Sequence, residues 1–137
     1  MSAPIELLKH VPMFARLSDK ELKTLAATFT EKTFQSGQEL TSEGQGAAGF
    51  FVIESGEADV AVDGASRRTL GPGDYFGEIA LIDGGSRTAT VTASSEGTCY
   101  GLTSWQFRPL VEEHGSIAWT LLEALASRIR ELDSSRH

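Results

Sequence analysis

The chain has 137 residues, of which 40% are hydrophobic and 23% charged, so it can build one domain with a single core. Its formal net charge of −7 argues against nonspecific binding to nucleic acid or to an anionic membrane surface, because both require an excess of Lys and Arg. Cys99 is the only cysteine, and the sequence shows neither a secretion signal nor an apolar run of membrane-spanning length, so we expect a cytoplasmic protein.

The first 30 residues are predicted to form helices. Apolar residues at 5, 7, 8 and 11 indicate a short first helix, which Pro12 is expected to stop. Ser18 and Glu21 have the spacing of a capping box and predict the start of a second helix. Its apolar residues share one face and are predicted to be core residues: Leu22, Leu25, Ala26 and Phe29.

Residues 31–103 predict a compact antiparallel roll, because short β-prone runs alternate with glycine-rich breaks. Asp63 and Gly64 form a strong signal for a hairpin turn, and residues 71–74 form another break. The strands are expected at residues 50–53, 58–63, 67–70, 88–93 and 98–103.

Residues 104–133 are predicted to be helical again. Ser104 is expected to cap a short helix with a frayed or kinked start at Pro109, and Gly115 to end it, with Ser116 capping the last helix. That last helix has the 4-3-4-3 apolar spacing of a coiled-coil seam: Ala118, Leu122, Leu125, Ile129 and Leu132. About two and a half heptads are too few to be stable alone. The seam must therefore dock on its own barrel, on a second copy, or on both, and we expect a protein partner or a homodimer through this helix.

The chemistry of the chain is concentrated in residues 76–91. Gly77 allows a ligand to approach the backbone, and the residues that follow it can form one helical turn whose free N–H groups suit an anion. The planar guanidinium of Arg87 carries N–H donors that can bind two phosphate oxygens at once. The carboxylate of Glu78 is an acceptor, which suits sugar hydroxyls. A phosphate joined to a sugar would satisfy both. The alternative is that Glu78 and Arg87 pair with each other on a solvated loop.

The whole string resembles a known cassette. It reads Phe76-Gly77-Glu78-Ile79-Ala80-Leu81, then a short loop, then Arg87-Thr88-Ala89-Thr90-Val91. This pattern is similar to the phosphate-binding cassette of cyclic-nucleotide-binding domains, which occur in cyclic-AMP-dependent protein kinase regulatory subunits, cyclic-nucleotide-gated channels and the bacterial catabolite activator protein. The resemblance extends upstream through residues 37–40 and 51–57 and covers roughly residues 5–132.

The resemblance implies a fold that is mainly β with flanking α: a double-stranded β-helix, or jelly-roll-like antiparallel β-roll. Residues 1–137 would form a single domain, with N-terminal helices over 1–30, the roll over 31–103 and C-terminal helices over 104–133.

The resemblance also implies the roles of the cassette residues. Glu78 would accept a hydrogen bond from the ribose 2′-hydroxyl, Arg87 would pair with the cyclic phosphate, and Gly77 would permit contact with the ribose. Backbone N–H groups near residues 80 and 89 would reach the phosphate. The implied binding set is Gly77, Glu78, Ile79, Ala80, Arg87, Thr88 and Ala89.

The implied ligand is a cyclic mononucleotide, with cyclic AMP favoured over cyclic GMP and no further cofactor. Thr88 occupies the position that helps to discriminate the bases, although its hydroxyl occurs with both ligands. Binding would reposition the cassette and the last helix, which a partner would read. Three leucines of that helix could cover the base or serve as core or dimer seam: Leu121, Leu122 and Leu125.

Three other functions receive less support. A transcription factor of the catabolite-activator type requires a recognition helix, which we do not see here, so that reading needs the chain to be a fragment. An enzyme requires a nucleophile–base pair or a metal site, and the three histidines are far apart in sequence, so no catalytic or metal residue is predicted. A fold kept only for dimerisation would not need Glu78 and Arg87. We expect Cys99 to be a buried hydrophobe and Trp105 and Trp119 to be packing residues; the alternative for Trp119 is contact with the base or with a second subunit.

Overall fold

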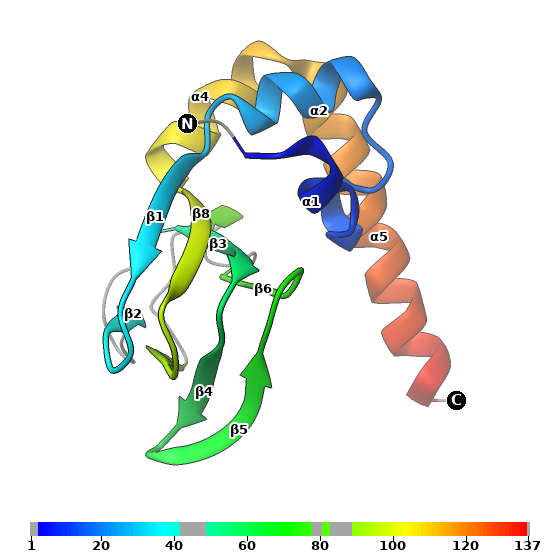
Figure 1. Ribbon diagram of the computed structural model, residues 1–137. Coiled ribbons are helices and arrows are strands. Elements are labelled where there is room, and N and C mark those ends of the chain that lie inside the picture. Colours follow the sequence, from blue (N-terminus) through cyan, green and yellow to red (C-terminus); the bar gives the residue numbers. More distant parts are fainter. Residues whose placement is uncertain (1–2, 42–48, 78–80, 83–88, 137) are drawn as a thin grey trace.

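The computed structural model describes residues 3–41, 49–77, 81–82 and 89–136 (Figure 1). Within these ranges the strands form two four-stranded antiparallel sheets, and helices from both ends of the chain gather together above the first sheet (Figure 1). The predicted mainly β roll with flanking helices is confirmed.

Each sheet combines strands from distant parts of the sequence. The first has the order β1-β8-β3-β6, and its strands are β1 (Thr30–Phe34), β8 (Gly97–Leu102), β3 (Phe50–Ser55) and β6 (Tyr75–Phe76). The second has the order β2-β7-β4-β5, and its strands are β2 (Glu39–Thr41), β7 (Thr90–Ala93), β4 (Ala58–Val62) and β5 (Ala65–Leu70). Strand β6 in one sheet and β7 in the other therefore flank the cassette.

Strand β3 is buried on both faces, because alternate side chains of a strand point to opposite sides. Phe51 and Ile53 belong to the apolar core between the two sheets. Phe50 and Val52 belong to a second core, which packs under the helices. The first sheet is therefore the layer that separates the interior of the roll from the helical cap.

The hairpin between β4 and β5 turns at the predicted residues. Asp63 and Gly64 have φ values of 53° and 78°, the left-handed conformation that a two-residue turn of this kind requires. Strand β5 begins at Ala65, two residues earlier than predicted, because the tight turn lets pairing start at once.

The N-terminal helices are α1 (Ile5–Lys9), the short 3₁₀ helix η1 (Pro12–Phe14) and α2 (Asp19–Ala26). The predicted capping box is confirmed: Glu21 N donates to Ser18 Oγ at 3.2 Å, and Ser18 N donates to Glu21 Oε1 at 2.9 Å. The residues predicted as core are buried: Leu22, Leu25, Ala26 and Phe29.

The C-terminal helices are α4 (Ser104–Glu113) and α5 (Gly115–Arg136), and both predicted caps are wrong. Thr103, not Ser104, caps α4, because Gln106 lies three residues after it and completes a reciprocal capping box. Helix α4 continues through Pro109. Helix α5 begins at Gly115, and Ser116 lies in its first turn.

Helix α5 docks on the domain through a face other than the predicted seam. Its buried residues are Ile117, Leu121 and Ala124. Ile117 and Leu121 belong to the core under the helices. Of the seam, Leu122, Ile129 and Leu132 are 55%, 61% and 66% exposed. Leu125, also a seam residue, packs against the same core. The two tryptophans predicted to pack, Trp105 and Trp119, are also exposed.

Candidate functional site

The structure describes the two ends of the cassette. Gly77 follows β6 directly, and Ala89 precedes β7. The other five predicted binding residues lie outside the described residues: Glu78, Ile79, Ala80, Arg87 and Thr88. Their roles stay predictions. The structure describes the residues on either side of them.

Gly77 marks the point where the chain leaves the sheet. Its φ is +91°, a conformation that side chains other than glycine rarely adopt. Its carbonyl accepts a hydrogen bond from Leu81 N at 3.0 Å, which has the four-residue spacing of an α-helix. The helical turn predicted for residues 78–81 falls largely outside the described residues and stays a prediction.

The strand before Gly77 is held firmly to the roll. Phe76 pairs with Phe51 of β3, and the two rings stack with centroids 5.2 Å apart. Just upstream, Asp74 closes the break at residues 71–74: its carboxylate accepts from Gly71 N at 2.8 Å, and its carbonyl accepts from Ile53 N at 2.9 Å. The residues at the start of the cassette are therefore held to strand β3 by backbone pairing and ring contacts.

The other end of the cassette is anchored in the second sheet. Ala89 packs against the core between the sheets, and Val91, two residues later, is 2% exposed within it. Strand β7 pairs with β2 on one side and β4 on the other, so it lies in the middle of its sheet. The cassette thus crosses from the first sheet to the second, and its two ends are positioned by different sheets.

Leu81 connects the cassette to the helical cap, a role that the sequence analysis did not assign. Its side chain is 1% exposed and belongs to the same core as Phe107 of α4 and Ile117 and Leu121 of α5. The signal in the sequence was a leucine at the end of the predicted helical turn. Ile82, the next residue, is 48% exposed.

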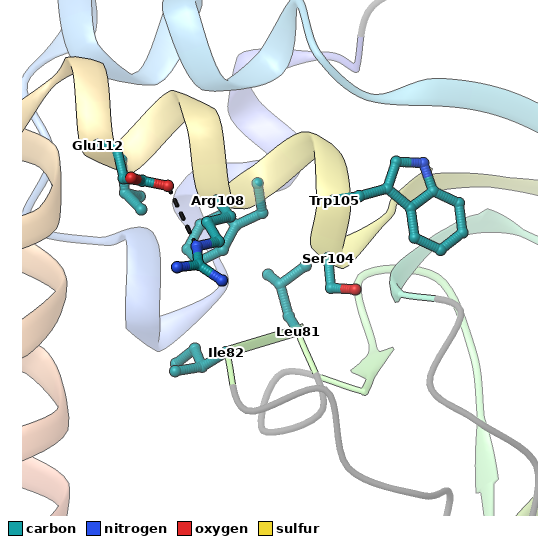
Figure 2. A pocket seen from close by; sticks show the side chains of 8 residues that line it. Leu81, Ile82, Ser104, Trp105, Arg108 and Glu112 are labelled. Carbon is teal, nitrogen blue, oxygen red and sulfur yellow. Dashed lines mark hydrogen bonds and ion pairs between the residues drawn. The ribbon is translucent and has the colours of Figure 1, made fainter.

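A groove of about 660 Å³ lies between the end of this turn and α4 (Figure 2). Leu81 and Ile82 form one side, and residues of α4 form the other. Arg108 and Glu112 of α4 are joined by an ion pair of 3.2 Å, drawn as the dashed line in Figure 2. The groove therefore borders the cassette on the side that faces the helices.

Two titratable groups near the central strands have pKa values shifted upward. Burial raises the pKa of the Cys99 thiol to about 11, with a smaller opposing effect of Lys32. The pKa of Tyr100 is raised to about 12, mainly by burial and secondly by a hydrogen bond to Glu31. The Tyr100 hydroxyl donates to Glu31 Oε2 at 3.2 Å and lies 3.5 Å from Glu54 Oε2. Both groups therefore stay protonated at neutral pH, and Cys99 is buried as predicted.

The described parts of the chain lack a metal-binding cluster and a membrane-spanning helix. Outside the undescribed ranges, no three His, Cys, Asp or Glu side chains are grouped so that they could hold a metal ion. Likewise, none of the helices that the structure describes is long and apolar enough to cross a membrane.

Comparison with protein families gives a match to the model described as "Cyclic nucleotide-binding domain", over residues 31–114. Among curated proteins, the chain is 41% identical over 91 residues to a cAMP-dependent protein kinase regulatory subunit of Yarrowia lipolytica, covering 65% of this chain and 24% of that protein. It is 38% identical over 110 residues to a cGMP-dependent protein kinase of Toxoplasma gondii, covering 80% of this chain and 11% of that protein. The chain thus spans a quarter or less of the length of these relatives.

Among solved structures, the chain is similar to the N-terminal domain of a transcriptional regulator from Streptomyces coelicolor A3(2). The TM-score is 0.88 with 29% sequence identity, and the match covers 96% of this chain and 95% of that one. The match therefore includes the helices at both ends as well as the roll.

Proposed function

This chain belongs to the family of cyclic nucleotide-binding domains, and from that premise we propose that it binds cyclic AMP in preference to cyclic GMP. The observation that carries the proposal is the match over residues 31–114, which contains the whole cassette. Relatives of both kinds match at similar identity, 41% over 91 residues for the cAMP-dependent one and 38% over 110 residues for the cGMP-dependent one, so the choice of cyclic AMP is decided by the binding measurement.

In the proposed site, two residues of the cassette bind two different parts of the ligand. Arg87 pairs with the cyclic phosphate, Glu78 accepts from the ribose 2′-hydroxyl, and Thr88 faces the base. The described ends of the cassette support this assignment, because the Gly77 carbonyl accepts a hydrogen bond from Leu81 N while Ala89 packs against the core between the sheets. Since the chain carries a net charge of −7, an anionic ligand has to be held by such a local arrangement of donors.

Calorimetric titration of the full chain with cyclic AMP, cyclic GMP and linear 5′-AMP tests the proposal. We expect the tightest binding for cyclic AMP, weaker binding for cyclic GMP, and a large loss for the linear nucleotide, which lacks the ring-closed phosphate. Absence of heat with both cyclic nucleotides at millimolar concentration would overturn the binding proposal, and a preference for cyclic GMP would overturn the choice of base.

We further propose that the bound state is signalled through Leu81 to α4 and α5. Leu81 sits at the end of the cassette turn and shares one core with Phe107 and Ile117, so a shift of the turn requires that core to repack. The ligand can shift this equilibrium only by its preference for one arrangement. Hydrogen exchange of α5 with and without cyclic AMP tests the link; unchanged protection at saturating ligand would contradict it.

A second candidate is that this regulatory module controls a larger protein, a transcription regulator or a ligand-regulated enzyme. The match to the N-terminal domain of a Streptomyces transcriptional regulator supports it, as does the small share of the curated relatives that the chain spans. The complete reading frame of the gene decides this point, because it shows whether a DNA-binding or enzymatic domain is encoded together with this module. For the module itself we propose no catalysis, and hydrolysis of cyclic AMP on incubation with the purified chain would contradict that. A cytoplasmic location stays a prediction.

A further inference from the structure

The ring of Phe51 on β3 meets residues of the other three strands of the first sheet. On β6 it stacks on Phe76, with the ring centroids 5.2 Å apart and the ring planes 23° apart. On β8 it lies beside Gly101, whose missing side chain leaves room for it. On β1 the ammonium group of Lys32 lies 5.4 Å from the centroid of the ring. Phe51 therefore connects both edge strands of this sheet, β1 and β6, through one side chain.

Gly101 allows the ring of Phe51 to extend across β8. Phe51 pairs with Gly101 on one side of β8, and on the other side of β8 Lys32 pairs with Cys99. A Cβ at position 101 would occupy the space in which the ring lies, because it would be 2.8 Å from Phe51 Cε1 and 3.1 Å from Cδ1. The glycine thus explains how a ring from β3 comes within reach of a lysine two strands away.

The ammonium group of Lys32 is placed over a ring and not beside a carboxylate. Lys32 is exposed, and the chain carries 19 acidic residues against 12 basic ones. Even so, Lys32 forms no ion pair with any residue in the described ranges. A cation within about 6 Å of a ring centroid is attracted to the face of that ring. Lys32 therefore restrains the position of the Phe51 ring from the β1 side.

On the β6 side the same ring bears directly on the start of the cassette. Strand β6 has only two residues, so its backbone ladder is short and the stack of Phe76 on Phe51 is a large part of what holds it. Gly77 follows Phe76, and its carbonyl accepts a hydrogen bond from Leu81 N at 3.0 Å. A displacement of the Phe51 ring would therefore move the residue from which the cassette begins.

We propose that Lys32 is a positioning residue for the nucleotide site. Through Phe51 and Phe76 it holds the start of the cassette in the arrangement that binds the ligand, without touching the ligand itself. The apparent affinity for a ligand falls with the fraction of molecules in the binding arrangement. Loss of the Lys32 charge should therefore weaken binding although the fold is kept. This inference rests on the proposed binding of a cyclic nucleotide.

Hydrogen exchange of the full chain without nucleotide tests the positioning alone. Lys32→Met keeps the length of the side chain and removes its charge, and it should speed exchange of the Leu81 amide about threefold. Lys32→Arg should keep the wild-type rate, because a guanidinium also binds ring faces. Lys20→Met, at an exposed lysine of α2, is the matched control and should change nothing. Equal Leu81 rates in all variants, or faster exchange throughout the chain in Lys32→Met, would overturn the proposal.

Calorimetric titration with cyclic AMP tests the consequence for binding. Lys32→Met should bind about threefold more weakly than the wild type, and Lys32→Arg and Lys20→Met should bind as the wild type does. In a Phe51→Leu background, Lys32→Met should cause no further loss, because the ring is gone. A further loss there would show that Lys32 acts by another route.

The two experiments separate this inference from the proposed function. If the wild type binds no cyclic nucleotide, the proposed function is wrong, and the exchange of the Leu81 amide still decides whether Lys32 positions the cassette. If the wild type binds and Lys32→Met binds equally well, the proposed function stands and the role of Lys32 is refuted. The Lys32 variants decide alone if Phe51→Leu does not fold, since Lys32 is exposed.

Discussion

The guanidinium of Arg16 donates a hydrogen bond to Ser127 Oγ at 2.7 Å. This contact joins the turn between η1 and α2 to the middle of α5, across 111 positions of sequence. Helix α5 is therefore tied to the N-terminal part of the chain by a polar contact, in addition to its apolar contacts.

The Arg16–Ser127 contact predicts a non-additive pair of variants. Arg16→Ala and Ser127→Ala should each lower the free energy of unfolding by about 0.5–1 kcal/mol, since the bond is exposed to water. The double variant should lose about as much as either single one, because all three remove the same bond. Urea unfolding measures this, and fully additive losses would show that the two residues act separately. Hydrogen exchange should show the loss concentrated in α5.

The proposed phosphate contact predicts a large effect of one arginine. Arg87→Ala should weaken cyclic AMP binding by roughly 3–5 kcal/mol, the usual cost of removing one member of a buried charge pair. Calorimetric titration measures it, with Arg67→Ala as the matched control, because Arg67 is exposed on β5 and is not one of the cassette residues. Equal affinity of the Arg87 variant and the control would refute the role of Arg87.

Gly97 at the start of β8 predicts a strong packing effect. A Cβ at this position would collide with the Ser55 carbonyl oxygen and lie 2.8 Å from Gly56 Cα, both of them backbone atoms that cannot easily move. Gly97→Ala should therefore destabilise the fold by about 3 kcal/mol or more.

A second glycine serves as the matched control for Gly97. Gly115 has open space around its Cβ position and begins α5, so Gly115→Ala should be neutral or stabilising by up to about 1 kcal/mol. Thermal unfolding separates the two, and equal effects would show that crowding at Gly97 is relieved by a backbone shift.

Those features of the fold that depend on neighbouring residues could be predicted from the sequence. The Ser18 and Glu21 capping box and the Asp63-Gly64 turn each follow from a few adjacent residues, and both were confirmed. The cap of α4 was wrong although the signal was present. Thr103 and Ser104 are both good caps, and Gln106, three residues after Thr103, decides between them.

The orientation of α5 could not be predicted, because it depends on tertiary packing. Its sequence has two adjacent apolar faces, one through Leu121 and one through Leu122, and periodicity alone does not say which meets the domain. Leu121 lies in the core under the helices, so the face that contains Leu121 is the one that meets the domain. In the candidate site, the cassette was identified from its local sequence, whereas the link from Leu81 to the helical cap required the fold.

The raised pKa values predict a loss of stability at alkaline pH. Burial raises the pKa of the Cys99 thiol from 9.0 in a model thiol to about 11 in the folded chain. The folded state therefore holds this proton more tightly than the unfolded state does, and the stabilisation is complete below pH 9 and is lost as the pH rises toward 11. Tyr100, with a pKa raised to about 12, acts in the same direction at higher pH.

Cys99→Ala isolates the contribution of the thiol. The variant is expected to be less stable at pH 8, because a buried side chain is shortened, but its stability should fall less steeply between pH 9 and 11 than that of the wild type. Urea unfolding at several pH values measures both slopes, and all other titrating groups are common to the two proteins. Identical slopes would mean that the thiol does not ionise on unfolding in this range. A thiol reagent at pH 8 should correspondingly label Cys99 quickly in urea and slowly in the folded chain, because burial both shields the sulfur and keeps it protonated.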